Sequence, residues 1–83
     1  MDVDLAPDAL EDFRALPGVI QKRVQKVIHR LRDWPAVSGA RALSGNLVGS
    51  YRIRTGDYRI RFRVEPGRIT IDKIGHRKDV YED

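Results

Sequence analysis

The sequence predicts a single α+β domain: an N-terminal strand, an antiparallel helical hairpin and a three-stranded antiparallel meander, with all strands in one sheet. The length of 83 residues suits one domain spanning residues 1–83. Apolar residues recur at helical spacing as far as residue 33, whereas apolar and polar residues alternate after residue 50. We therefore expect the helical hairpin to cover one face of the sheet.

Residues 1–33 predict one strand and two helices. Val3 and Leu5 alternate with acidic residues, which indicates a short strand over residues 1–5. Pro7 suits the first turn of the next helix, and Pro17-Gly18 separates that helix from a second one over residues 19–33. The apolar face of the first helix consists of Ala9, Leu10, Phe13 and Leu16. That of the second consists of Ile20, Val24, Val27, Ile28 and Leu31.

The rest of the chain predicts a loop and three strands. Residues 35–50 are rich in Gly and Ser, which favours a loop with little regular structure. The three strands are expected at residues 51–54, 58–64 and 68–74. The turns between them contain Gly56 and Gly67. Ile74 departs from the alternation of the preceding isoleucines, which predicts a β-bulge near Asp72-Lys73.

The composition excludes several classes of site. The chain has no cysteine, which excludes disulfides, thiolate metal ligands and a cysteine nucleophile. The acidic residues are scattered without a magnesium-site motif, so neither a metal nor a cofactor is expected. No apolar run approaches the ~20 residues of a membrane helix, and the N-terminus has no hydrophobic signal region. We expect a cytoplasmic protein without membrane contact.

Positive charge concentrates in the second half of the chain. The formal net charge is +4, and the sequence pI is about 9.9. Residues 1–40 hold six basic and six acidic residues, whereas residues 41–83 hold ten basic and six acidic ones. A clustered positive field attracts polyanions and speeds their encounter with the protein.

Five arginines are expected on one face of the sheet. In a strand, successive side chains point to opposite faces. The arginines that share the face opposite to the core are Arg52, Arg54, Arg59, Arg61 and Arg63. Like charges on paired strands oppose folding, and guanidinium groups bind phosphate oxygens and stack on bases. The sequence therefore predicts a surface that binds a polyanion, with RNA as the expected ligand.

A second group of functional residue types closes the chain. His76, Arg77, Lys78 and Tyr81 follow the third strand directly, so this segment can fold over the arginines. Histidine can transfer protons near neutral pH, arginine can stabilise an anionic transition state, and tyrosine can stack on a base or transfer a proton. Taken alone, His76 and Tyr81 fit structural roles as well, so their assignment depends on a wider pattern.

Three segments of the second half supply that pattern. They are Leu43-Ser44-Gly45-Asn46-Leu47, the stretch from Tyr51 to Arg59 and the stretch from Ile74 to Tyr81. With the helical hairpin, they make the chain resemble the RelE branch of the RelE/ParE toxin superfamily over essentially its full length. The resemblance implies a RelE-like microbial RNase fold and a ribosome-dependent endoribonuclease that cuts mRNA in the decoding site. It also implies a cognate RelB-like antitoxin in a toxin–antitoxin hetero-oligomer.

The resemblance further implies roles for individual residues. Arg59 matches the arginine that contacts the scissile phosphate, and Arg77 matches the arginine at the end of the last strand. Tyr81 matches the terminal tyrosine that stacks on or activates the substrate nucleotide. His76 completes the expected catalytic group, at a position that is not uniformly histidine in such toxins. The expected RNA-binding residues are Arg52, Arg54, Arg61 and Lys78.

Arg52 and Arg54 stand at positions where such toxins often have lysine. Arginine does not readily release its proton, so neither residue replaces a lysine that acts as general base, although both stabilise charge. The proton acceptor is then His76, Tyr81 or a group of the substrate and ribosome. The expected reaction is metal-independent: the 2′-hydroxyl attacks the adjacent phosphate while arginines neutralise the developing charge.

Two other functions are compatible with the same sequence. A ParE-type toxin would inhibit DNA gyrase without nuclease activity, because one fold can support both functions. Arg77 and Tyr81, in combination with Arg59, favour the nuclease. The third hypothesis is a non-catalytic RNA-binding or regulatory domain, or a toxin that has lost its activity. Under either toxin hypothesis we expect an acidic or amphipathic antitoxin segment to cover the basic surface.

Overall fold

The computed structural model describes residues 1–78, which contain two α-helices and five strands. The strands are β1 (Asp2–Leu5), β2 (Arg41–Ala42), β3 (Ser50–Thr55), β4 (Tyr58–Glu65) and β5 (Arg68–His76). The helices are α1 (Pro7–Arg14) and α2 (Gly18–Leu31), and a single 3-10 turn lies at Gly45–Leu47. In the described part of the chain, no helix has the length and apolar character needed to cross a lipid bilayer.

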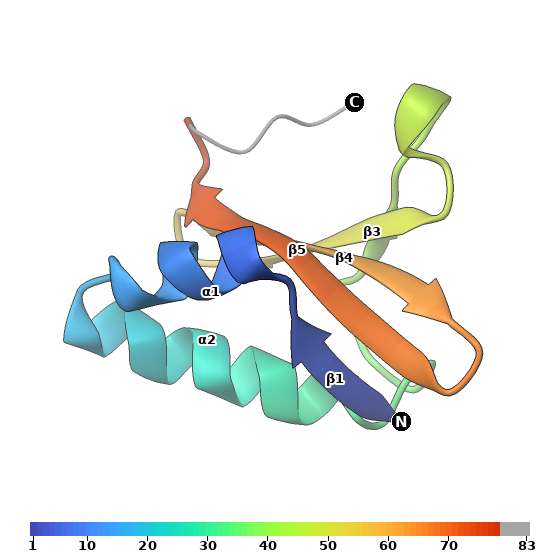
Figure 1. Cartoon of the computed structure of the whole chain (residues 1–83), viewed down its shortest axis with the longest axis horizontal. Coiled ribbons are helices and arrows are strands. Elements are labelled where there is room, and N and C mark those ends of the chain that lie inside the picture. The colour runs from blue at the N-terminus through green and yellow to red at the C-terminus, as the bar shows by residue number, and fades with distance from the viewer. Residues whose placement is uncertain (79–83) are drawn as a thin grey trace.

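All five strands join one sheet in the order β1-β5-β4-β3-β2. β1 lies parallel to β5, and the other neighbours are antiparallel. Figure 1 shows α1 and α2 on the same side of this sheet. The predicted α+β order of strand, helical hairpin and meander is thus confirmed. β2 and the 3-10 turn lie within residues 35–50, where the sequence predicts a loop with little regular structure.

The helices pack on the sheet through their apolar faces. The residues of α2 that line the core are Ile20, Val24, Val27, Ile28 and Leu31. On α1, Ala9 is buried, while Phe13 and Leu16 are partly buried against the same core. Leu10, predicted on this face, is instead 38% exposed. Ala9, Phe13 and Leu16 recur at four and three residues, whereas Leu10 lies about 100° around the helix from Ala9 and so turns out of the row.

An aromatic cluster closes the core where the segment after α2 meets the sheet. The ring of Trp34 contacts Tyr51 and Phe62 edge-on, with centroid separations of 4.9 and 5.5 Å. Tyr51 stacks on Phe62 at 5.7 Å. Such pairs contribute about 0.5–1.5 kcal/mol each beyond the area they bury. The cluster therefore fixes β3 and β4 against the helical layer, which also fixes the face that these strands turn away from it.

The predicted β-bulge is present in β5. Arg61 pairs with Lys73, whereas the next residue of β4 pairs with Ile71, so Asp72 is the extra residue. The bulge allows Ile71 and Ile74 to face the core together, with exposed fractions of 0% and 2%. A regular strand would turn one of them to solvent, because residues at odd separation point to opposite faces.

Candidate nucleic-acid interface

The register of β3 and β4 places the five arginines on one side of the sheet. Arg52 lies opposite Arg61, and Arg54 lies opposite Arg59. Directly opposed residues project from the same side, and the isoleucine pair between these arginine pairs is buried beneath the helices. The arginines therefore project from the side that the helices leave open, as predicted. We call Arg52, Arg54, Arg59, Arg61 and Arg63 the arginine face.

The members of the arginine face differ in how far they reach solvent. Arg54 and Arg63 are exposed, and Arg59 is partly buried. Arg52 is only 5% exposed. A guanidinium group at that depth meets a phosphate only if neighbouring groups move aside. Arg52, predicted to bind RNA, is therefore not part of the accessible surface in this conformation.

Arg61 is held by an internal ion pair. Its Nε donates to Oδ1 of Asp72 at 2.9 Å, with 23% and 21% of the two side chains exposed. Asp72 is the bulge residue, so the same irregularity that orders the core also supplies this carboxylate. The predicted RNA-binding role of Arg61 would require RNA to compete with Asp72, which lowers its expected contribution.

Arg77 and Lys78 follow the end of β5, beside the turn between β3 and β4. The backbone N–H of Arg77 donates to the carbonyl of Asp57 at 2.7 Å, which ties the segment to that turn. The side chains of Arg77 and Lys78 are both exposed. Gly75, two residues before Arg77, lies opposite Arg59. The structure thus brings Arg59 and Arg77 to the same end of the sheet.

The chain matches known toxins along almost its whole length. The family model for the ParE toxin of type II toxin–antitoxin systems matches residues 3–81. This chain belongs to the RelE/ParE toxin superfamily. Toxin RelE3 of Methanocaldococcus jannaschii is 29% identical to it over 85 residues, covering 99% of this chain and 97% of the relative.

Solved structures of RelE-type toxins share the fold of this toxin. The RelBE2 toxin–antitoxin complex of Mycobacterium tuberculosis contains a chain that superposes with a TM-score of 0.80 at 24% identity, covering 94% of this chain and 92% of that one. A chain of the RelB-RelE complex of Methanococcus jannaschii superposes with a TM-score of 0.77 at 28% identity, covering 93% of each. The predicted RelE-type membership and RelE-like fold are thus confirmed.

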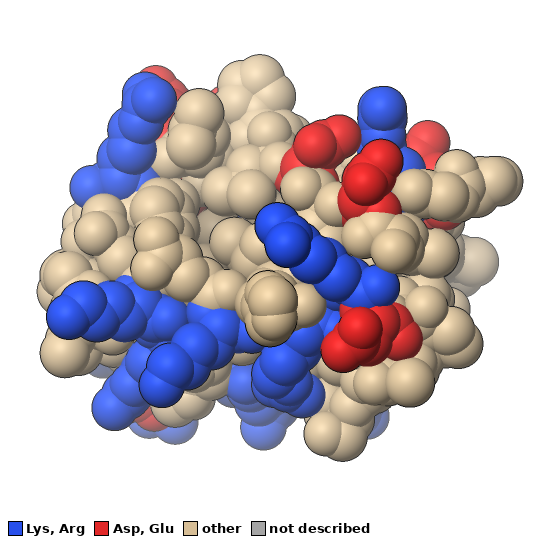
Figure 2. All heavy atoms as spheres, turned by 90° about the horizontal axis from the view of Figure 1, so that it is seen from below, with Lys and Arg blue, Asp and Glu red and all other residues tan. Residues whose placement is uncertain are grey.

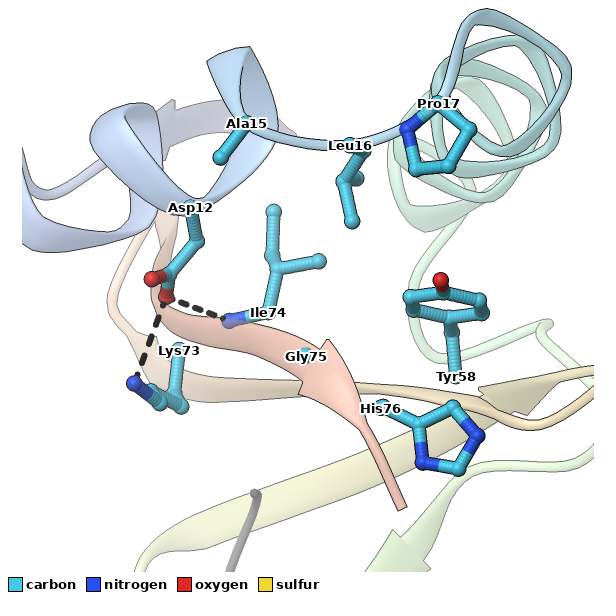
Figure 3. A pocket seen from close by; sticks show the side chains of 9 residues that line it. All are labelled: Asp12, Ala15, Leu16, Pro17, Tyr58, Lys73, Ile74, Gly75 and His76. Carbon is cyan, nitrogen blue, oxygen red and sulfur yellow. Dashed lines mark hydrogen bonds and ion pairs between the residues drawn. The ribbon is translucent and has the colours of Figure 1, made fainter. Parts of the chain in front are cut away.

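The structure separates His76 of the toxin from the arginine face. Because the bulge reverses the alternation of β5, His76 lies opposite Tyr58, and the two rings meet edge to face at 5.6 Å. Figure 3 shows both rings on the side of the sheet that faces Leu16 and Pro17. The sequence groups His76 with Arg59 as catalytic residues, but the two side chains leave the sheet on opposite sides. The predicted bulge was the signal for this, because an extra residue turns the side chains that follow it to the opposite side of the sheet.

Tyr58 and His76 line a shallow pocket of about 360 Å³ between the end of α1 and β5 (Figure 3). At its inner side, Oδ2 of Asp12 accepts the backbone N–H of Ile74 at 3.0 Å and lies 3.7 Å from Nζ of Lys73. β5 extends here beyond the end of β1, so the Asp12 carboxylate satisfies a backbone group that no strand pairs. The polar groups of Asp12 and Lys73 on the α1 side of the pocket therefore have structural roles at the edge of β5.

Arg41 is a basic residue that the sequence analysis does not assign to the site. It lies on β2, directly opposite Arg52, and its side chain is exposed. It extends the arginine face of the toxin from β3 and β4 to a third strand, β2. Tyr81 lies outside the described residues, so its role stays a prediction. Among residues 1–78, no three His, Asp or Glu side chains gather as a set of metal ligands.

Proposed function

We propose that this toxin is a ribosome-dependent endoribonuclease that cuts mRNA. The observation that carries the proposal is the register of β3 and β4, which aligns Arg54 with Arg59 on the side of the sheet that the helices leave open. Arg77 follows the strand next to Arg59. Three guanidinium groups at one end of a sheet suit a ribose-phosphate chain, because guanidinium binds phosphate oxygens through two parallel hydrogen bonds.

In the proposed reaction the 2′-hydroxyl attacks the adjacent phosphate, forming a 2′,3′-cyclic phosphate and releasing the 5′-oxygen of the next nucleotide. Arg59 and Arg77 hold the phosphate and neutralise the charge that develops on it. Arg54 and the exposed Lys78 position the backbone on either side. The nucleophile belongs to ribose, so DNA is not a substrate. No step calls for a metal ion, and we expect cleavage to resist EDTA.

The proton acceptor of this reaction is not an arginine, since guanidinium does not readily release its proton. Of the groups considered from the sequence, His76 projects on the other side of the sheet, against Tyr58. We therefore assign proton transfer to Tyr81 or to groups of the substrate and ribosome. His76 is expected to hold the end of β5, where its Nδ1 accepts the backbone N–H of Lys78 at 3.3 Å.

We also propose a cognate RelB-like antitoxin as a partner. The related toxins of Mycobacterium tuberculosis and Methanococcus jannaschii were crystallised in complexes with their antitoxins. An arginine face that binds RNA has to be covered when the toxin is inactive. An acidic segment of an antitoxin would do so through complementary charge, and the resulting hetero-oligomer would be cytoplasmic.

A second candidate function is inhibition of DNA gyrase without nuclease activity. It is favoured by the family model, which describes ParE toxins. The RelE-type relatives and the alignment of Arg54, Arg59 and Arg77 at one end of the sheet favour the nuclease. The nuclease should produce cut transcripts in cells that express the toxin, whereas a gyrase inhibitor should leave the transcripts uncut.

The deciding experiment compares wild type with Arg59→Ala by primer extension on an abundant transcript after induction in cells. Discrete cuts are expected with wild type, and their yield should fall about 100-fold or more in the variant, as when one stabilising donor is removed from an active site. Arg68→Ala is the matched control, because Arg68 is exposed at the far end of β5, where it pairs with Asp4 on the surface. Gyrase-linked DNA damage without any cuts would assign the toxin to the ParE type.

A further inference from the structure

Of the seven glycines in the chain, all within residues 1–78, only Gly75 lies inside a strand. Five of the others have a positive φ, which favours glycine, and Gly18 begins α2. Gly75 pairs with Arg59 within β5, and the extended backbone of a strand suits any residue. Glycine is also less favourable there than alanine, because it has more conformational freedom to lose. The backbone therefore does not explain why this position lacks a side chain.

Gly75 lacks its side chain on the side of the sheet that carries the arginine face. It lies directly opposite Arg59, and directly opposed residues project from the same side. Its neighbours Ile74 and His76 turn to the helix side, where Ile74 is buried and the His76 ring meets Tyr58. Gly75 itself is partly exposed. A Cβ at this position would therefore project from the arginine face, next to Arg59.

Basic residues are the neighbours of Gly75 in three directions. Lys73 precedes it by two residues and Arg77 follows it by two, while Arg59 lies across from it on β4. A spacing of two residues in a strand is about 6.6 Å, and directly opposed Cα atoms lie about 4.5–5.5 Å apart. The position without a side chain thus lies within reach of several long cations.

Two cations near this position have carboxylate partners. Nζ of Lys73 lies 3.7 Å from Oδ2 of Asp12, toward α1 (Figure 3). Across from Lys73, Nε of Arg61 donates to Oδ1 of Asp72 at 2.9 Å. Both ion pairs come before the glycine in the direction of β5. We therefore assign a phosphate to the cations nearer the end of the strand.

Positive charge alone does not locate the cut. Figure 2, which views the molecule from the side of α2, shows Lys and Arg side chains over much of the lower half of that face as well. Cleavage also requires that the reacting atoms come within about 3–3.5 Å of each other in a fixed orientation. Glycine within a strand often marks a site where a ligand approaches the backbone closely. Gly75 combines such an approach with guanidinium groups at neighbouring positions.

We propose that Gly75 is the floor of the cleavage site, where the ribose and phosphate at the cut lie against the backbone of β5. Arg59 and Arg77 then reach the phosphate from two sides. The proposal rests on the proposed function and adds a residue that positions the substrate by having no side chain. Its role is steric, because a side chain here would set how closely the RNA approaches the sheet.

The first test is the series Gly75→Ala and Gly75→Val, with primer extension on an abundant transcript. The methyl group of alanine would move the RNA outward by about 1.5 Å, the length of one carbon–carbon bond. A displacement of about 1 Å can lower a rate about 100-fold, so we expect such a loss in Gly75→Ala and a larger one in Gly75→Val. Thr70→Ile is the matched control and should cut as wild type does, because it adds bulk on the same side of β5 but opposite Arg63.

Thermal denaturation and RNA binding distinguish this role from a structural one. The Tm of both variants should be no lower than that of wild type, because alanine and valine are more favourable than glycine in a strand. Fluorescence anisotropy with single-stranded RNA should give a log–log salt slope lower by about 0.7 for Gly75→Ala, as for one lost phosphate contact, although no charge has been removed. Thr70→Ile should leave the slope unchanged.

Either wild-type cutting or an unchanged salt slope in Gly75→Val would overturn the proposal. A Tm well below that of wild type would overturn it as well, since the glycine would then serve the fold. If wild type itself cuts no transcript, the proposed function fails. The salt slope of Gly75→Ala, which does not depend on cutting, then decides alone whether RNA lies against Gly75.

Discussion

Arg41 projects from a strand of only two residues, directly opposite the nearly buried Arg52. Because it is exposed, it can contact a phosphate that Arg52 does not reach in this conformation. A strand so short has no periodicity, and nothing in the sequence around Arg41 distinguishes it from other loop cations. Its place beside the arginine face depends on pairing between β2 and β3, which is a tertiary feature.

We expect Arg41→Ala to weaken binding of single-stranded RNA. Removal of one phosphate contact should reduce the log–log salt slope by about 0.7. The free energy of unfolding should stay within about 0.5 kcal/mol of wild type, because the residue is exposed. Fluorescence anisotropy across a salt series and urea denaturation measure the two quantities. Arg68→Ala, which removes the same charge at the far end of the sheet, should leave the slope unchanged. An equal effect of both variants would show that Arg41 contributes only general positive charge and no specific phosphate contact.

Alternation of residue types predicted which side of the sheet each arginine occupies, but not which arginines are available. Arg61 faces the predicted side and yet is paired with Asp72 at 2.9 Å. That carboxylate comes from the next strand, eleven residues along the chain, and depends on the bulge for its position. His76 was grouped with the arginines because the predicted bulge was not carried through to the residues after it, although a single extra residue reverses every side chain that follows.

At the scale of the element, α2 carries Lys22, Lys26 and Arg30 on its exposed side at intervals of four residues, so like charges are neighbours. We expect Lys22→Gln/Lys26→Gln to raise the free energy of unfolding by about 0.5–1 kcal/mol, since it removes two like-charge contacts and a cation near the positive end of the dipole. For a domain of this size that corresponds to a rise in Tm of about 2–8 °C. Thermal denaturation at low salt measures it, and the gain should shrink at high salt as the charges are screened.

The conservative variant, which keeps both positive charges, serves as the control for this gain in stability. Lys22→Arg/Lys26→Arg keeps the charges and should keep the Tm of wild type within about 1–2 °C. If the Gln variant were less stable than wild type, Lys22 and Lys26 would contribute to folding instead of opposing it.

Elements with strong periodicity were predictable from the sequence, whereas those made by tertiary contacts were not. The stripe from Ile20 to Leu31 defined α2, and the alternation on either side of Gly56 defined the hairpin of β3 and β4. β2 pairs with β3 through two residues, Arg41 and Ala42, so its local sequence carries no strand signal. The parallel pairing of β1 with β5 joins segments more than sixty residues apart, and it likewise comes from assembly of the sheet.

At the scale of the molecule, α2 covers one side of the sheet and the arginine face lies on the other, and the principal extents are 31 × 26 × 24 Å. At physiological ionic strength the Debye length is about 8 Å. Charges on opposite sides of a two-layer domain are therefore largely screened from each other. The cations of α2 should therefore add little to the electrostatic field at the arginine face.

This separation predicts that the cations of α2 contribute little to the binding of single-stranded RNA on the arginine face. Lys22→Gln/Lys26→Gln should leave the affinity for single-stranded RNA within about twofold of wild type near 0.1 M salt, whereas Arg59→Ala should weaken it. The free-energy changes of the two variants should add within about 0.5 kcal/mol when they are combined, because distant sites with no shared partner act independently. Fluorescence anisotropy with a labelled single strand measures all three variants. Equal weakening by Lys22→Gln/Lys26→Gln and Arg59→Ala would show instead that α2 and the arginine face act on the same RNA strand.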